Sequence, residues 1–269
     1  MLRFFASAAA AAVLLSSASS ACAGDGRPWW SGDWYVSVGG AAFSAPRFEG
    51  ANSRKLQFAP MFSVGKVGPA VRFSSRNDNP SVSLFDNGAV RAGIVGKLVT
   101  KRDEGTDAEL VGLSEVRWGL EAGGFVEVYP TDWLRARAEV RHGIRSHQGV
   151  VADLAVDAFT DITPTLRLSG GPRATLASAK FFDAYYGVDA AESAKSGLSQ
   201  YEPGSGVHSL GAGAALTWQA TDAITTSAFT EYRRLTGPSA DSSLVRERGA
   251  RDQLLIGLSA TYKFGFTLD

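Results

Sequence analysis

Residues 133–145 decide the fold, and they read Trp-Leu-Arg-Ala-Arg-Ala-Glu-Val-Arg-His-Gly-Ile-Arg. Apolar side chains occupy one set of alternate positions from Leu134 to Ile144, interrupted by His142. Charged side chains occupy positions between them: Arg135, Arg137, Glu139, Arg141 and Arg145. Alternation with a period of two over about a dozen residues predicts a β-strand. Strands of soluble sandwiches usually run to about 5–6 residues, whereas this one is long enough to cross a bilayer at a tilt.

The same alternation recurs along the chain and predicts about twelve strands. They are expected near 34–43, 56–66, 69–75, 80–85, 88–100, 117–129, 132–146, 149–160, 163–176, 207–219, 222–235 and 252–266. The hairpin 69–85 alternates least clearly, and without it about ten strands remain. Both counts are even, as in bacterial single-chain barrels.

The connections between these strands alternate in length. Counted from a periplasmic N-terminus, every second connection is a tight turn: Lys66-Val67-Gly68, Asp86-Asn87-Gly88, Pro130-Thr131, Asp161-Ile162 and Ala220-Thr221. Four of the others are long: 44–55, 101–116, 177–206 and 236–251. The turn at His147-Gln148 is short on the outer side and fits less well. Short periplasmic turns and long outer loops are typical of transmembrane barrels. The sequence therefore predicts an all-β fold, a transmembrane antiparallel up-and-down β-barrel.

The N-terminus has the pattern of a secretory signal peptide. A single charge, Arg3, precedes an apolar stretch, and Ala21 and Ala23 satisfy the small-x-small rule for cleavage before Gly24. Cys22 raises the alternative of lipid attachment, but Ser19 stands where a Leu-like residue is needed. We therefore expect a cleaved signal, 1–23, followed by one barrel domain, 24–269, in the outer membrane of a Gram-negative cell.

Composition argues against several functions. The chain has 27 basic and 27 acidic residues, so no global charge points to nucleic acid. Its one Cys lies in the expected signal, which leaves no thiol for a disulfide, catalysis or a metal. His142, His147 and His208 are scattered, without the spacing of metal ligands or of a catalytic set. We expect no enzymatic activity, no metal and no cofactor.

Aromatic side chains near the predicted strand ends suit the headgroup level of a bilayer. They are Trp34, Tyr35, Trp118, Tyr129, Trp133 and Trp218. The alternative is that these are ordinary core aromatics.

The inward charges are ordered by strand. Arg135, Arg137, Glu139 and Arg141 on one strand are flanked by acids on its neighbours: Glu121, Glu127, Asp153 and Asp157. Because opposite charges on adjacent strands stabilise a sheet, we hypothesise a charge-paired, closed interior. The alternative is a solvated channel wall whose charges are unpaired.

Two outer loops carry further features. In loop 177–206, Asp189 and Glu192 have the spacing of a capping box and Gly197 is a natural helix stop, so a short helix near 190–196 is expected. With Phe181, Phe182, Tyr185 and Tyr186 ahead of this helix, the loop could form a gate or a partner platform, or simply pack on itself. In the last outer loop the cluster Arg246, Arg248 and Arg251 could contact lipopolysaccharide phosphates; the alternative is a solvated charge run.

Several segments of the chain resemble the MltA-interacting protein / OmpV family of outer-membrane proteins. The most specific are Phe181-Phe182-Asp183-Ala184-Tyr185-Tyr186-Gly187-Val188 and Ala194-Lys195-Ser196-Gly197-Leu198. Leu235-Thr236-Gly237-Pro238, Phe48-Glu49-Gly50 and His147-Gln148-Gly149 are also similar. Two departures stand out. Ser243 replaces a common Pro, and Thr267-Leu268-Asp269 follow the aromatic barrel-assembly signal of Tyr262, Phe264 and Phe266.

The resemblance implies a scaffold that holds a murein-degrading lytic transglycosylase and a penicillin-binding synthase near the outer membrane. The short periplasmic turns leave only a small docking surface for such partners. Two alternatives remain open: a permeability barrel for small solutes or osmotic and envelope-stress adaptation, and a surface adhesin acting through the long outer loops.

Overall fold

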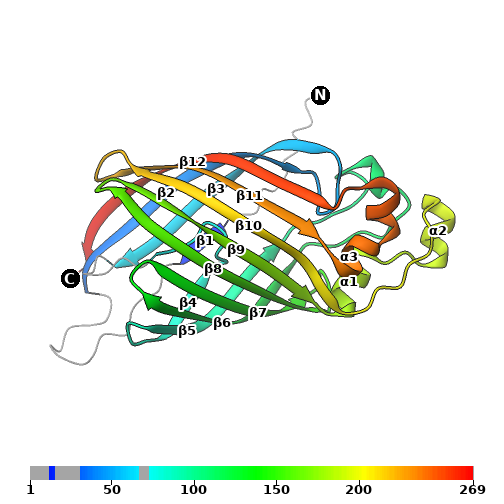
Figure 1. The fold of residues 1–269 in the computed structure, drawn as a ribbon, viewed down its shortest axis with the longest axis horizontal. Coiled ribbons are helices and arrows are strands. Elements are labelled where there is room, and N and C mark those ends of the chain that lie inside the picture. Colours follow the sequence, from blue (N-terminus) through cyan, green and yellow to red (C-terminus); the bar gives the residue numbers. More distant parts are fainter. Residues whose placement is uncertain (1–11, 16–30, 67–72, 269) are drawn as a thin grey trace.

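The computed structural model describes residues 12–15, 31–66 and 73–268. Eleven strands of the expected mature chain curl into a barrel with strands inclined to its long axis (Figure 1). They are β2 (Gly32–Pro46), β3 (Arg54–Lys66), β4 (Ser81–Asp86), β5 (Val90–Val99), β6 (Gly119–Thr131), β7 (Leu134–Ile144), β8 (Val150–Thr163), β9 (Leu166–Ala177), β10 (Gly206–Gln219), β11 (Ile224–Leu235) and β12 (Asp252–Leu268). The predicted all-β class is confirmed.

Neighbouring strands of this barrel are antiparallel, in the order β3-β2-β12-β11-β10-β9-β8-β7-β6-β5-β4. The first and last strands join side by side, from Gly32 opposite Leu268 to Ser44 opposite Ile256. Within the described residues β3 and β4 are not paired with each other, so the hydrogen-bonded sheet is open there. A further short strand, β1 (Ala12–Leu15), lies parallel to β3 and belongs to the predicted signal peptide. The predicted cleavage residues Ala21, Ala23 and Gly24 lie outside the described residues.

The predicted strand at 69–75 is the main difference from expectation. Residues 67–72 lie outside the described residues, and the described remainder, 73–75, is not a strand. Instead, residues 73–80, here called the lumen segment, contact inward-facing side chains of several strands before β4 begins. The other half of the predicted hairpin, 80–85, is confirmed as β4.

Loop length mostly sorts by end of the barrel, as predicted, and the expected exception at His147-Gln148 is present as the short connection 145–149 at the end of the long loops. The connections 87–89, 132–133, 164–165 and 220–223 are short and share an end with Gly32 and Leu268. The connections 47–53, 100–118, 178–205 and 236–251 are long and lie at the opposite end, where the helices gather in Figure 1. The predicted turn at 66–68 falls largely outside the described residues.

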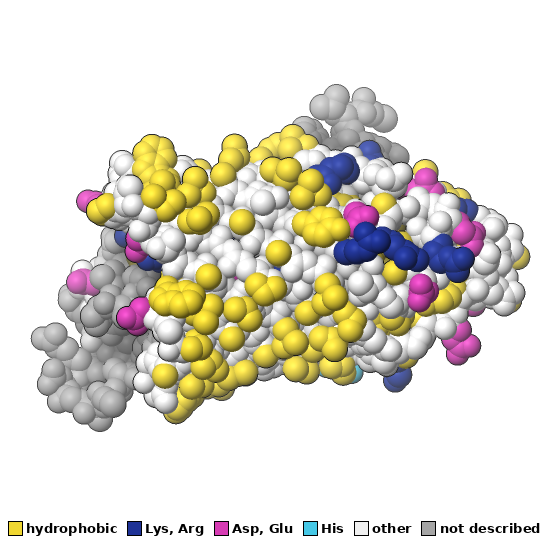
Figure 2. Space-filling model, in the orientation of Figure 1, with side chains coloured by type: hydrophobic (Ala, Val, Ile, Leu, Met, Phe, Trp, Pro, Cys, Tyr) yellow, Lys and Arg dark blue, Asp and Glu magenta, His cyan; other side chains and the backbone are white. Residues whose placement is uncertain are grey.

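The outer face of the barrel is apolar. Large hydrophobic side chains such as Val140 and Leu258 are 54% and 65% exposed, and Figure 2 shows hydrophobic side chains over this face with most charges toward the two ends. Soluble proteins rarely expose so large an apolar surface, whereas a lipid-facing belt requires one. Trp118, Trp133 and Trp218 are more than half exposed at strand ends, where interfacial aromatics are expected. None of the described helices is long and apolar enough to span a membrane.

Short helices fill the long loops. They are η1 (Ala108–Leu110), α1 (Ala179–Tyr186), α2 (Ala190–Ser196), α3 (Gly237–Asp241) and the π-helical turn η2 (Leu244–Arg248). The predicted helix 190–196 is confirmed as α2. Its capping box joins the Asp189 side chain to the Glu192 backbone N–H and the Glu192 side chain to the Asp189 N–H, and Gly197 ends it with a φ of 77°.

Candidate functional site: a charged lumen beneath a loop cap

Strand β7 carries a row of charges on its lumen face. Arg135, Arg137, Glu139 and Arg141 are all buried, between 0% and 5% exposed. Their spacing of two residues places them on one side of the strand, and the apolar side chains between them face outward. Arg145 was expected to continue this row. However, β7 ends at Ile144, and Arg145 has a left-handed φ of 75°, so its guanidinium lies 4.0 Å over the exposed Trp118 ring.

Acids on both neighbouring strands meet this row, and the register explains why. Arg137 lies opposite Glu127 of β6, and Arg135 lies opposite Asp157 of β8. The Arg135 Nη2 donates to Asp157 Oδ2 at 2.7 Å, and the Arg141 Nε donates to Glu121 Oε2 at 2.9 Å. The structure therefore brings together all eight predicted ladder residues: Glu121, Glu127, Arg135, Arg137, Glu139, Arg141, Asp153 and Asp157.

The ladder is part of a wider network that sequence reasoning missed. Arg91 of β5 binds Glu127 at 3.2 Å, and Arg173 of β9 binds Asp157. Five adjacent strands are thereby linked across their lumen faces. Burying charges carries a large desolvation cost, which is offset only when several partners surround each charge. This requirement is met here, since Arg141 alone binds three carboxylates, those of Glu121, Glu139 and Asp153.

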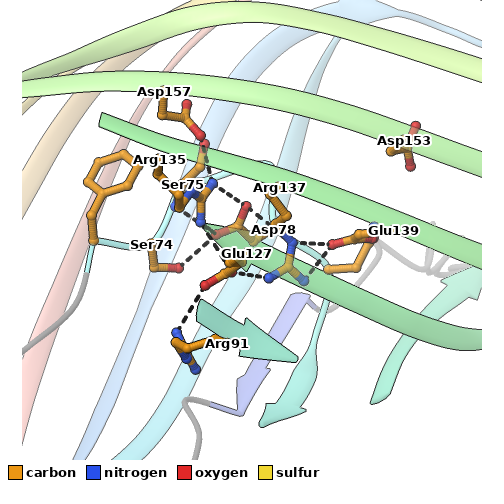
Figure 3. A network of polar contacts seen from close by, with 12 residues as sticks. Ser74, Ser75, Asp78, Arg91, Glu127, Arg135, Arg137, Glu139, Asp153 and Asp157 are labelled. Carbon is orange, nitrogen blue, oxygen red and sulfur yellow. Dashed lines mark hydrogen bonds and ion pairs between the residues drawn. The ribbon is translucent and has the colours of Figure 1, made fainter. Parts of the chain in front are cut away.

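The lumen segment binds the same network from inside the barrel. Asp78 accepts hydrogen bonds from both terminal nitrogens of Arg135, at 2.6 and 2.8 Å, as Figure 3 shows. Asn79 donates to Glu139 at 2.7 Å. Segment 73–80 also contacts other walls. Arg76 lies 3.5 Å over the Phe229 ring of β11, and Phe73 stacks on Phe159 of β8 with centroids 4.3 Å apart. The segment therefore fills space between β7, β8 and β11.

Tyr129 belongs to this interior and not to the aromatic girdle predicted for it. Its hydroxyl oxygen lies 2.9 Å from Glu127 Oε2 and 3.3 Å from the backbone carbonyl oxygen of Phe73, and its one proton serves these two acceptors. The period of two explains the difference, because Tyr129 shares the face of Glu127 on β6.

The long loops close together over the mouth opposite the short turns, and we call loops 47–53, 100–118, 178–205 and 236–251 the cap. One apolar cluster within the cap joins α1 to α3 and η2 through Phe182, Tyr186, Ala240 and Val245. A second joins Phe48, Leu110, Leu198 and Leu244, one from each of the four loops. The cap is thus a packed unit with two apolar cores.

Arg248 helps to hold this cap together. Its guanidinium donates to the backbone carbonyl of Glu109 at 2.8 Å and to that of Ser196. Two of its donors are thus occupied by backbone carbonyls of the cap, and the contact of Arg246, Arg248 and Arg251 with lipopolysaccharide stays a prediction. Arg251 is 46% exposed and lies 3.8 Å from Asp241.

The residues of the family-like motif lie at the C-terminal ends of helices α1 and α2. Tyr186 is buried in the first apolar cluster, and Tyr185 packs against it with its ring 4.7 Å from that of Phe181. Gly187 ends α1, with its N–H bonded to the carbonyls of Phe182 and Asp183. At the other helix, Ser196 ends α2 and its hydroxyl accepts from the Leu198 N–H, while Gly197 supplies the left-handed cap.

A polar cluster lies just beneath α1. The Tyr186 hydroxyl is 2.9 Å from His208 Nε2, and Glu49 Oε1 is 2.8 Å from Arg233 Nη1. Burial raises the pKa of Tyr186 well above its usual value. Burial would also raise the pKa of Glu49, but the electrostatic influence of His208, Arg233 and Lys97 outweighs it and lowers the pKa to about 2. Glu49 and His208 were not singled out as a pair, because 159 positions separate them in the sequence.

The other histidines have separate surroundings. His147 is buried and lies 3.2 Å from Glu121 Oε1, while His142 faces outward from β7. Among the described residues, no group of three or more His, Cys, Asp or Glu side chains is placed to hold a metal ion. The three predicted assembly-signal aromatics, Tyr262, Phe264 and Phe266, lie on the outer face of β12 and are 40–53% exposed.

An apolar outer belt, a buried charged interior, short turns at one rim and long loops at the other define the class: an outer-membrane β-barrel. A family model described as "MltA-interacting protein MipA" matches residues 38–264, so the chain belongs to this family, as the motif resemblance indicated. A comparison with curated proteins gives no match.

Several solved structures are similar in fold. Neisserial surface protein A is 11% identical, with 87% of this chain and 99% of that chain covered and a TM-score of 0.27. OprB of Pseudomonas putida is 15% identical, with 68% and 46% covered and a TM-score of 0.38. A FadL homologue of Pseudomonas aeruginosa is 10% identical, with 86% and 90% covered and a TM-score of 0.37. Similarity at this level carries nothing about function.

Proposed function

We propose that this chain is a non-enzymatic, closed outer-membrane barrel that acts as a scaffold for murein enzymes. Its partners would be a murein-degrading lytic transglycosylase and a penicillin-binding synthase. The family's description, an MltA-interacting protein, supports a protein partner. The single observation that favours a binding role over solute passage is the filled lumen, where Asp78 of the lumen segment binds Arg135 of the wall.

A periplasmic partner would meet a small surface. The connections at that rim, 87–89, 132–133, 164–165 and 220–223, are short, so the docking face is the rim itself. Asp132 and Asp222 are exposed there. Charged groups at the edge of an interface set association rate and specificity, so these two carboxylates are the natural positions to alter.

The test is co-purification of a lytic transglycosylase with the barrel after mild crosslinking in cells. We expect capture by the wild-type chain and weaker capture by the double variant Asp132→Arg/Asp222→Arg. Asp241→Arg is the matched control, because Asp241 is 65% exposed in the cap at the opposite end. Absence of the enzyme under varied crosslinking conditions would refute the scaffold. Equal capture by all three chains would refute docking at Asp132 and Asp222.

A permeability function is the second candidate, and one observation favours it. The described part of the lumen segment is not a strand of the wall, and Asn79 and Asp78 hold it by side-chain contacts that could be exchanged. Liposome swelling assays with the wild type and with a chain lacking 178–200 test this candidate. Solute uptake that increases when the loop is removed would support a gated pore, and no uptake by either chain would exclude it.

A further inference from the structure

A cavity of about 200 Å³ lies beneath loop 47–53, against the ends of strands β2, β3, β11 and β12. Apolar side chains of Ala45, Leu235 and Leu255 form part of its wall. Its polar lining residues are Arg47, Glu49, Gln57, Glu231, Arg233 and Gln253. The cavity therefore offers charges of both signs beside an apolar surface.

The cavity lies between the cap and the lumen segment. Loop 47–53 of the cap forms one end of it. At the other end, Glu231 lines the cavity and also accepts a hydrogen bond from Asn77 of the lumen segment. Arg76, next to Asn77, packs over the Phe229 ring at 3.5 Å. A solute in this cavity is thus enclosed by the two parts of the molecule that fill the lumen and cover its mouth.

Glu49 has one carboxylate oxygen that is available to a ligand. Its Oε1 accepts a hydrogen bond from Arg233 Nη1 at 2.8 Å. Its Oε2 receives no hydrogen bond from the described residues, because His208 Nε2 is 3.8 Å away and lies 2.9 Å from the Tyr186 hydroxyl. The Glu49 side chain is 41% exposed and lines the cavity. A carboxylate oxygen in this position is suited to an ammonium group.

Arg47 supplies the opposite charge on the same lining. Its Nε lies 3.7 Å from Asp107 Oδ2, its one ion pair among the described residues. Asp107 is itself bound to the Ser53 hydroxyl at 2.5 Å and to the Glu109 N–H at 3.0 Å. Within the described part of the chain no oxygen accepts a hydrogen bond from the Arg47 guanidinium, and 45% of the side chain is exposed. The planar fork of a guanidinium matches a carboxylate.

The other polar groups of the lining satisfy one another. Arg233 Nε lies 3.0 Å from Glu231 Oε1. The Gln253 side chain accepts from the Gly50 N–H at 3.2 Å and donates to the Ala250 carbonyl at 2.8 Å. One cation and one carboxylate oxygen of the lining remain without a hydrogen bond from the described residues. The lining is therefore complementary to a solute that carries both charges.

We propose that this cavity binds a small zwitterionic solute of the amino-acid class, whose carboxylate is held by Arg47 and whose ammonium group is held by Glu49. A volume of about 200 Å³ suits such a solute, since a water molecule takes up roughly 30 Å³. The apolar wall formed by Leu235 and Leu255 accommodates the carbon atoms of the solute. This site goes beyond the scaffold role and does not depend on it.

The experiment follows thermal unfolding of the folded, detergent-solubilised chain in glycine, in methylammonium chloride and in sodium acetate, each compared with sodium chloride at matched ionic strength. Glycine carries both charges, whereas each of the other two solutes carries one of them. A ligand that binds only the folded state raises the unfolding midpoint in a saturable way. Stabilisation by exclusion of a solute from the protein surface grows steadily with concentration instead. We expect a saturable rise with glycine that exceeds the rise with either singly charged solute.

Two variants and two matched controls locate the site. Arg47→Gln and Glu49→Gln each remove one charge from the lining, and each should raise the half-saturating glycine concentration about tenfold, because a hydrogen bond to a charged group is lost. Arg246→Gln and Glu104→Gln remove the same charges from exposed positions of the cap outside the cavity, and should respond as the wild type does. Each shift is measured against the same variant in sodium chloride, so that the effect of the substitution on stability cancels.

Each outcome decides the proposal. A saturable rise with glycine that both cavity variants lose and both controls keep supports the assigned solute class. The proposal is overturned if glycine gives no saturable rise, or if methylammonium or acetate alone gives a rise as large. It is also overturned if either cavity variant responds to glycine as the wild type does, or if the controls lose the response. Heat-modifiable migration on gels verifies beforehand that every variant is folded.

Discussion

Arg135 of β7 binds both carboxylate oxygens of Asp78, at 2.6 and 2.8 Å, across 57 positions of sequence. The pair joins the barrel wall to a segment inside the lumen. Arg135 is fully buried and also binds Asp157 at 2.7 Å. A bidentate pair of this kind fixes geometry as well as charge, so it anchors the lumen segment in one position.

Replacing Asp78 by Asn should destabilise the barrel by about 2 kcal/mol. The substitution removes one charge from a buried network and leaves Arg135 with a weaker partner, a change that generally costs a few kcal/mol. Urea unfolding of the refolded chain in lipid vesicles measures the loss. Asp161→Asn is the matched control. Asp161 pairs with Arg167 at an exposed site, so less than about 1 kcal/mol is expected. Equal effects of the two substitutions would show that the Asp78 contact is not a buried anchor.

Arg141 should be the most sensitive position of the network. Arg141→Met leaves the carboxylates of Glu121, Glu139 and Asp153 facing one another. We expect a loss of about 3–5 kcal/mol, the usual effect of breaking a buried ion pair. The double variant Arg141→Met/Glu121→Gln should recover part of that loss, because one unpaired charge is removed. Strictly additive losses in the same urea assay would contradict a coupled network.

The sequence predicts the wall of the barrel well because alternation and loop length are local properties. The inward ladder on β7 and the capping box at Asp189 both follow from the spacing of a few residues. Arg145 departs from the alternation only because β7 ends one residue earlier, at Ile144, and the backbone then turns left-handed.

The interior and the cap were harder to predict because they depend on contacts distant in sequence. The strand predicted at 69–75 rested on weak alternation, whereas segment 73–80 is held by Arg135, Glu139 and Phe229 from other strands. Helix α1 was missed because Ser178, its N-cap, is a weak signal alone: Phe181 stands where a capping box needs Glu or Gln, and the Ser178 hydroxyl accepts from the Val150 N–H instead of capping the helix. No local signal places Arg102 under the cap either, since its burial depends on Phe48 and Tyr185.

Glu49 should make the stability of the cap depend on acid pH. Its pKa is lowered from 4.5 to about 2, so its contribution is complete above pH 4.5 and is lost as the pH falls toward 2. The side chain is 41% exposed, so solvent screens its charge. We therefore expect ionised Glu49 to contribute about 1 kcal/mol to the free energy of unfolding. The difference in unfolding free energy between the wild type and Glu49→Gln should therefore be constant from pH 7 to 5 and disappear near pH 2. A difference that stays constant down to pH 2 would contradict this.

Removing the cap of α2 should loosen loop 178–205 without altering the barrel. Asp189→Ala deletes the hydrogen bond to the Glu192 N–H, and loss of such a cap costs about 1 kcal/mol. Limited proteolysis should cut the variant severalfold faster within this loop, while heat-modifiable migration of the barrel on gels stays unchanged. Ser199→Ala, at an exposed position of the same loop, is the control. Proteolysis at the wild-type rate would mean that the packed cap, and not the capping box, holds the loop.

The central claim is that the lumen of this barrel is blocked to ions, and single-channel recording in planar bilayers tests it most directly. The charge network, the lumen segment and the packed cap all lie along the path that ions would take. The account predicts no steady conductance from the purified wild-type chain, and brief openings at most from Asp78→Asn. A large, steady conductance from the wild type would contradict it.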